Sequence, residues 1–179
     1  MLPIVTLGLA CAAPPASGPA VGDKPAPYSF VVCTGAQRGK LHCFVCDAGD
    51  KPFVAFFARE PSPALGTLAR RCEDAARQAK GAEAKGWVTF LKPDQLAFDA
   101  TARRFATEHN LAAFSVGVFE DVVGPPDYKI AADAAITVVI ASGAKVRSTF
   151  AFTDGSPGTR ELDEIVKGWK ATLAPGAPK

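Results

Sequence analysis

The most apolar stretch of the chain is Phe53–Ala58, in which every side chain is apolar. Pro52 and Pro61 bound it on either side. A short segment that is apolar on both faces is typical of a fully buried strand, so we predict a central strand here. Further strands are predicted at Tyr28–Cys33, Trp87–Leu91 and Leu111–Phe119, and in a hairpin formed by Ala134–Ala141 and Val146–Phe152.

Three amphipathic helices are predicted between and after these strands. Ser62 and Pro63 suit the N-cap and the first position of the first helix, and Gly81 suits its end. A second helix runs from Pro93-Asp94 to about His109, and Thr159 is expected to cap the third. The first and third helices carry apolar residues every three or four positions: Leu65, Leu68, Cys72, Ala75, Ala76 and Ala79, then Leu162, Ile165, Val166, Trp169 and Leu173.

The order of these elements predicts one α/β domain spanning 21–174, with a mixed sheet flanked by helices on both faces. A total of 179 residues with 48% hydrophobic composition is enough for one good core. Residues 175–179 are a tail. The net charge of +2 and the lack of a basic stripe argue against a nucleic-acid partner. No phosphate-binding or dinucleotide motif is present, so no cofactor is expected.

Residues 1–20 combine a short apolar segment with a Pro/Ala-rich tract. That pattern predicts an export signal followed by a flexible linker, because the apolar segment is too short to span a bilayer. Leu7–Cys11 resembles a bacterial lipobox, with Cys11 as the lipidated residue, although Gly8 departs from that pattern. Three alternatives stay open: a lipid anchor, a cleaved signal, or a cytosolic protein with a frayed tail. Export to the periplasm, envelope or exterior is favoured, and the lipid anchor is the one expected membrane contact.

Cys43 and Cys46 form a CxxC pair just before the central strand. This spacing suits a redox-active dithiol, a structural disulfide or half of a zinc site. Neighbouring His42 could promote thiol chemistry, whereas no helix N-terminus is expected at the pair. A zinc site would need two further ligands from His42, Cys33 and Cys72, and the second spaced pair that is usual for structural zinc is missing. Cys72 lies on an apolar helix face, which favours a buried, inert thiol.

The chain as a whole resembles the thioredoxin-fold proteins, closer to the peroxiredoxin and TlpA-like branch. The segment beginning Val21-Gly-Asp-Lys-Pro resembles the entry to that branch, and the strand, helix and terminal hairpin order is similar. The resemblance implies a reactive cysteine directly after the central strand. Arg59 and Glu60 lie there instead, and we expect this pair of side chains to be exposed to solvent. The proline usual before the terminal hairpin is absent too.

Two functions follow from this comparison of motif and fold. The first is a thiol-disulfide oxidoreductase that acts on a disulfide substrate through Cys43 and Cys46, with Cys43 as the more exposed nucleophile. The second is a non-enzymatic envelope protein that binds a protein partner and uses the CxxC as a structural disulfide or zinc site.

Overall fold

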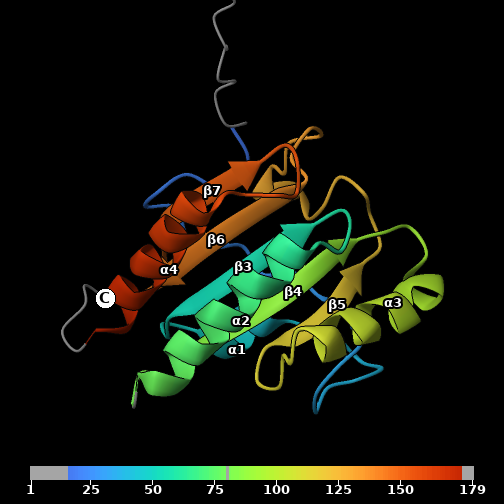
Figure 1. The fold of residues 1–179 in the computed structure, drawn as a ribbon, viewed down its shortest axis with the longest axis horizontal. Coiled ribbons are helices and arrows are strands. Elements are labelled where there is room, and N and C mark those ends of the chain that lie inside the picture. The colour runs from blue at the N-terminus through green and yellow to red at the C-terminus, as the bar shows by residue number, and fades with distance from the viewer. Residues whose placement is uncertain (1–15, 80, 175–179) are drawn as a thin grey trace, which may run out of the picture.

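The structure is a computed structural model that describes residues 16–79 and 81–174 (Figure 1). Its strands are β1 (Phe30–Val32), β2 (Leu41–His42), β3 (Phe53–Ala58), β4 (Lys85–Leu91), β5 (Ser115–Phe119), β6 (Ile136–Ser142) and β7 (Lys145–Phe152). Its α-helices are α1 (Phe44–Ala48), α2 (Pro63–Gln78), α3 (Gln95–Glu108) and α4 (Thr159–Leu173), and a 3₁₀ turn, η1, covers Pro126–Tyr128. Cys11 and the tail at 175–179 lie outside the described residues.

All seven strands form one sheet in the order β2-β1-β5-β4-β3-β6-β7. Strand β3 runs parallel to β4 and antiparallel to β6, and each of its residues is buried, as its uniformly apolar sequence predicts. Strand β7 lies at the edge, where most of its residues are only partly buried. The mixed sheet predicted from the sequence is confirmed.

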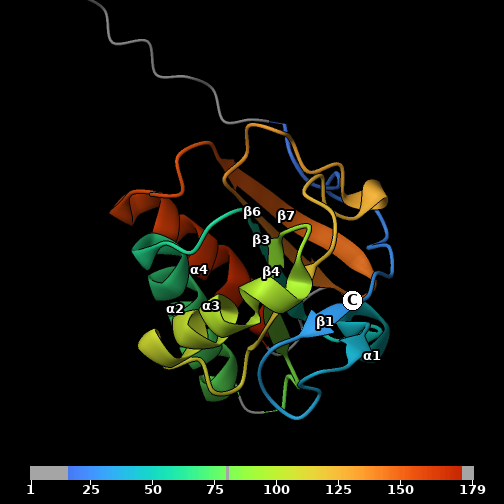
Figure 2. The same ribbon diagram turned by 90° about the vertical axis from the view of Figure 1, so that its right-hand side faces the viewer.

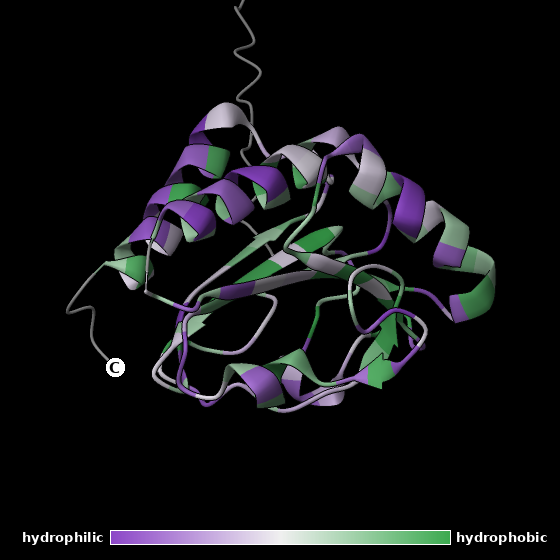
Figure 3. Ribbon diagram, turned by 90° about the horizontal axis from the view of Figure 1, so that it is seen from below, coloured by the Kyte–Doolittle hydropathy of each residue, from purple (hydrophilic) through white to green (hydrophobic). Residues whose placement is uncertain are grey.

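Helices cover both faces of the sheet, but unequally (Figure 2). The long helices α2, α3 and α4 pack on one face, where their apolar stripes form one core with Phe56, Val88 and Ile140. The opposite face is covered by the short α1, by η1 and by irregular segments (Figure 3), which pack on a second core around Trp87 and Phe57. None of the described helices is long and apolar enough to cross a membrane.

Local sequence explains where the long helices begin. The Ser62 hydroxyl accepts a hydrogen bond from the Leu65 N–H, and Pro63 occupies the first turn of α2 as expected. Asp94 caps α3 through the Ala97 N–H. Helix α4 departs from the prediction, since Gly158 holds the N-cap position without a side-chain hydrogen bond and Thr159 is already helical.

Residues before Val21 pack against the domain. The Ser17 hydroxyl is buried and lies 2.7 Å from the Thr137 hydroxyl of β6. The Thr149 hydroxyl of β7 donates to the Pro19 carbonyl at 2.9 Å. Ordered contacts therefore begin within the stretch expected to be a flexible linker, while the export signal itself stays a prediction.

Candidate functional site

The CxxC pair lies where a short hairpin leads into a short helix. Strand β2 pairs with β1 through Phe30 and His42, and Cys43 follows directly as the N-cap of α1. Cys43 and Cys46 are joined by a disulfide with a Cα–Cα distance of 5.4 Å. The Cys46 N–H also donates to Cys43 Sγ at 3.2 Å. The hairpin and the helix turn thus fix both sulfur atoms.

Aromatic packing holds α1 on the sheet. The Phe44 ring lies 5.5 Å from Phe30 and stacks on Trp87 at 5.6 Å, while Ala48 is buried at the end of the helix. These contacts direct Cys46 outward, and it is exposed whereas Cys43 is half-buried. The helix start at the CxxC and the greater exposure of Cys46 both contradict the sequence interpretation. The cause is packing on Trp87, a residue far along the chain.

Three polar side chains contact one another beside helix α1. His42 Nε2 lies 2.7 Å from Asp47 Oδ2, and the same oxygen lies 3.9 Å from Lys85 Nζ. The His42 ring also meets the edge of Phe44 at 4.5 Å. Asp47 and Lys85 were not singled out by the sequence, because their proximity depends on α1 packing beside the start of β4.

The remaining cysteines lie away from this pair. Cys33 and Cys72 are free, fully buried and part of the core beneath the long helices, whereas α1 packs on the opposite face. Burial raises the pKa of each thiol to about 12, which keeps both protonated at neutral pH. With Cys43 and Cys46 oxidised and His42 paired with Asp47, the alternative zinc set is not assembled, and the described residues contain no cluster suited to a metal ion.

Structural hydrogen bonds occupy the position at which the family resemblance implies a reactive cysteine. Arg59 follows β3, and its guanidinium donates to three loop carbonyls: Val122 at 2.6 Å, Ala131 at 3.0 Å and Ala134 at 3.0 Å. Glu60 pairs with Lys92. Arg59 is therefore a partly buried anchor rather than a solvated residue. No cis peptide bond occurs among the described residues.

The CxxC lies near the opposite end of the central strands from that position. Lys85 and Trp87, its neighbours, begin β4 and pair with Phe53 and Ala55 of β3. Arg59 instead follows Ala58, at the carboxyl end of β3. The disulfide therefore lies at a different place in the fold from the position at which the family resemblance implies a reactive cysteine.

Comparison with solved structures identifies the fold. A Chlorobium tepidum protein provisionally named thiol:disulfide interchange protein DsbE superposes with a TM-score of 0.65 at 14% identity, covering 87% of this chain and 99% of that chain. The chain has the thioredoxin fold. A Bacteroides thetaiotaomicron protein provisionally named protein disulfide isomerase gives 0.63 at 13% identity, covering 89% of this chain and 95% of that one.

Peroxiredoxins share the same thioredoxin fold with the chain. Peroxidoxin BcpB from Mycobacterium tuberculosis gives a TM-score of 0.56 at 17% identity, covering 86% of this chain and 95% of that one. No family model matches the sequence, and no curated protein sequence matches it. At these identities the comparisons establish the thioredoxin fold alone.

Proposed function

We propose that the protein is a thiol-disulfide oxidoreductase that works through Cys43 and Cys46. The observation that carries this proposal is an exposed disulfide whose inner sulfur, Cys43 Sγ, accepts the Cys46 N–H at 3.2 Å. A hydrogen bond from a backbone N–H favours the charged form of an acceptor, here the Cys43 thiolate that forms when the bond opens.

The geometry suggests an order of events. A substrate thiolate attacks the exposed Cys46 Sγ, which forms a mixed disulfide and breaks the Cys43–Cys46 bond with its electron pair on Cys43 Sγ. A second substrate thiolate then attacks the substrate sulfur, releasing a substrate disulfide and a Cys46 thiolate. Two substrate thiols are oxidised, the protein disulfide is reduced, and the two substrate protons end on Cys43 and Cys46. The same steps in reverse reduce a substrate disulfide.

The structural neighbours support this chemistry. Those named a thiol:disulfide interchange protein and a protein disulfide isomerase have the same fold over most of the chain. The motif is displaced, however, and the usual position holds Arg59. We infer that activity resides at the hairpin and α1, not at the start of α2.

Redox titration of the purified protein tests the proposal. In graded glutathione buffers, followed by alkylation and mass spectrometry, we expect Cys43–Cys46 to open reversibly between about −270 and −120 mV, the range of oxidoreductases. Cys43→Ser and Cys46→Ser should each abolish exchange with a disulfide peptide. Cys72→Ser is the matched control and should retain it, because Cys72 is buried on the other face.

The competing function is a binding scaffold in which the disulfide is structural. The aromatic packing of α1 favours it, because Phe44 already attaches this helix to Trp87. A potential below about −300 mV, with loss of structure on reduction, would establish the scaffold. Undiminished exchange in Cys43→Ser would remove the oxidoreductase proposal.

We also infer export, with protein thiols or disulfides as substrates and no nucleic-acid partner. Support comes from the apolar N-terminal segment of the sequence and from a structural neighbour described as a secreted Mycobacterium tuberculosis disulfide oxidoreductase. Disulfides persist in oxidising compartments. Fractionation of cells that express the full chain should find it outside the cytosol, and release from membranes by Cys11→Ser would identify a lipid anchor. Retention of the full chain in the cytosol would contradict export.

A further inference from the structure

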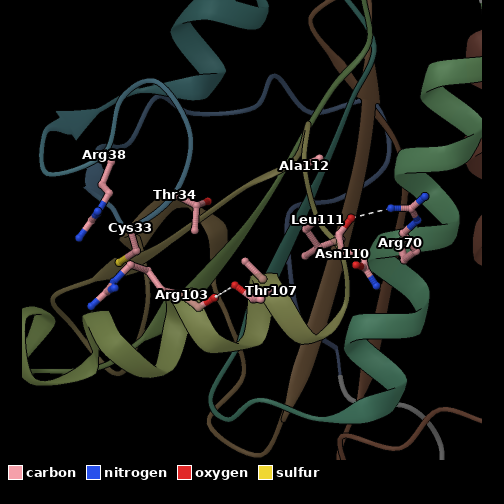
Figure 4. Close-up of a pocket in the computed structure, with 10 residues that line it drawn as sticks. Cys33, Thr34, Arg38, Arg70, Arg103, Thr107, Asn110, Leu111 and Ala112 are labelled. Carbon is pink, nitrogen blue, oxygen red and sulfur yellow. Dashed lines mark hydrogen bonds between the residues drawn. The ribbon is translucent and has the colours of Figure 1, made fainter.

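An open pocket of about 610 Å³ lies between the β1–β2 hairpin, helix α3 and the loop that follows α3 (Figure 4). Its residues Cys33, Ala106 and Leu111 belong to the core beneath the long helices. The disulfide helix α1 packs on the other face of the sheet, so this pocket is separate from the CxxC.

Arginines from three elements line the pocket. Arg38 comes from the hairpin, Arg70 from α2 and Arg103 from α3. Figure 4 shows Arg38 and Arg103 beside Cys33, while Arg70 lies at the opposite end. The pocket is therefore lined with positive charge from parts of the chain that are far apart in sequence.

The three arginines differ in how far they are already paired. Arg70 is satisfied, because its guanidinium donates to Asp74 and to the Asn110 carbonyl. Arg103 uses Nε for Asp99 at 2.8 Å, and its two terminal nitrogens make no hydrogen bond to a described residue. The exposed Arg38 guanidinium makes no hydrogen bond or close ion pair with any part of the chain that the structure describes, and its charge acts on the same carboxylate, Asp99, at longer range. Two guanidinium groups therefore face one carboxylate, and one positive charge is left unmatched.

The rest of the lining is neutral or apolar. Ala106 and Leu111 supply an apolar wall. Burial and the neighbouring Asp99 raise the pKa of the Cys33 thiol to about 12, so the floor carries no charge at neutral pH. A neutral, partly apolar floor beside an unmatched guanidinium suits an amphipathic anion better than a fully hydrated ion.

We propose that this pocket binds a small organic anion, whose carboxylate or phosphate oxygens pair with Arg38 and Arg103 while its apolar part rests on Ala106 and Leu111. The planar guanidinium donors of arginine match both kinds of oxyanion in a two-pronged geometry. Ligand binding here does not depend on the redox chemistry, since the two sites lie on opposite faces of the sheet.

Titration of the full chain, followed by ¹⁵N-resolved NMR, tests the proposal. Hexanoate should shift the amide signals of Thr34, Arg38, Arg103 and Leu111, with a dissociation constant of about 1 mM or lower. Hexyl phosphate in a parallel titration separates the two oxyanion sources: tighter binding of hexyl phosphate than of hexanoate at the same residues identifies a phosphate ligand. Hexanol is the uncharged control and should leave these signals in place.

Variants supply the decisive comparison. Arg38→Ala should weaken binding at least about tenfold, the effect of one lost charge-assisted contact. Arg104→Ala is the matched control, because Arg104 neighbours Arg103 in sequence but does not line the pocket and pairs with Glu108 instead; the affinity of this variant should equal that of the parent. A Cys43→Ser variant should bind normally, which separates this proposal from the proposed function. Equal binding of hexanol, equal affinity in Arg38→Ala, or no response to either anion would overturn it.

Discussion

Glu73 is a fully buried carboxylate on the inner face of α2. Its oxygens accept hydrogen bonds from three consecutive backbone N–H groups, those of Ala112, Ala113 and Phe114, at 3.2, 2.9 and 2.7 Å. From the sequence alone, a carboxylate in the middle of an amphipathic helix is predicted to lie at the surface. Its role is instead to hold the turn that leads into β5, and no local pattern indicates this.

Replacing Glu73 with Gln should lower the free energy of unfolding by about 2 kcal/mol, since an amide NH₂ would face a donor and leave a buried N–H unpaired. Urea unfolding followed by circular dichroism measures this loss. Asp74→Asn is the control: its ion pair with Arg70 is partly exposed, and we expect a loss of at most about 1 kcal/mol. Equal losses for the two variants would contradict the anchoring role.

The two buried thiols predict how stability depends on pH. Their pKa values rise from the ordinary value of 9.0 to about 12 in the folded protein. Between these values the unfolded chain loses the thiol protons while the folded chain keeps them, so the free energy of unfolding falls as pH rises from 9 to 12. Below pH 9 both states are protonated and this contribution does not change.

Unfolding titrations across the range from pH 9 to 12 measure the effect. The double variant Cys33→Ala and Cys72→Ala lacks both groups, so its stability should decline less steeply with pH than that of the parent protein. Parallel slopes for the two proteins would show that these thiols ionise alike in the folded and unfolded states.

At the scale of elements, helices α2 and α3 meet at a glycine. A Cβ added to Gly66 would overlap the ring of His109, the residue that caps the end of α3. In an isolated helix, replacing glycine by alanine stabilises by about 1 kcal/mol. The close approach reverses this expectation, because the His109 ring also packs on Phe105 at 4.8 Å and cannot move without losing that contact.

Gly66→Ala should therefore lower the melting temperature. In the Gly66→Ala and His109→Ala double variant, the added methyl group has space. Alanine at position 66 should therefore lower the melting temperature less in the His109→Ala background than in the parent. Thermal unfolding of the two single variants and the double variant gives this coupling directly. Additive effects would mean that the ring is displaced freely.

Elements differ in how well the sequence predicts them. The long helices and buried strands follow from apolar periodicity and capping residues such as Ser62, and each was found. Strand β2 and helix α1 were missed, because they span two and five residues. Elements so short carry no periodic signal, and α1 depends on the packing of Phe44 against Trp87.

At the scale of the whole molecule, the thioredoxin fold was predictable from the order of elements, but the position of the chemistry was not. The CxxC could be found in the sequence, yet its exposure and its neighbours Asp47 and Lys85 follow only from tertiary packing. The same is true of the arginine pocket, whose charges come from α2, α3 and the hairpin. Sites assembled from distant segments leave no spacing signal.

The start of the domain is the last feature that depends on the whole molecule. Sequence composition places it at Val21, but Ser17 is buried against β6 and also accepts the Ala131 N–H at 2.9 Å. Thr137, its partner, is fully buried with this segment in place, so removing Ser17 leaves the Thr137 hydroxyl without its partner in the chain.

A variant that begins at Val21 should therefore unfold with a free energy lower by at least about 2 kcal/mol than one that begins at Ala16, through the combined loss of the buried hydrogen bonds of Ser17 and that of Pro19. Ser17→Ala in the longer variant separates the two contributions, since it removes the hydroxyl and keeps the Pro19 carbonyl. Chemical unfolding measures all three proteins. Equal stability of the two truncations would place the start of the domain at Val21, and residues 16–20 would then be a linker that contacts the sheet without stabilising it.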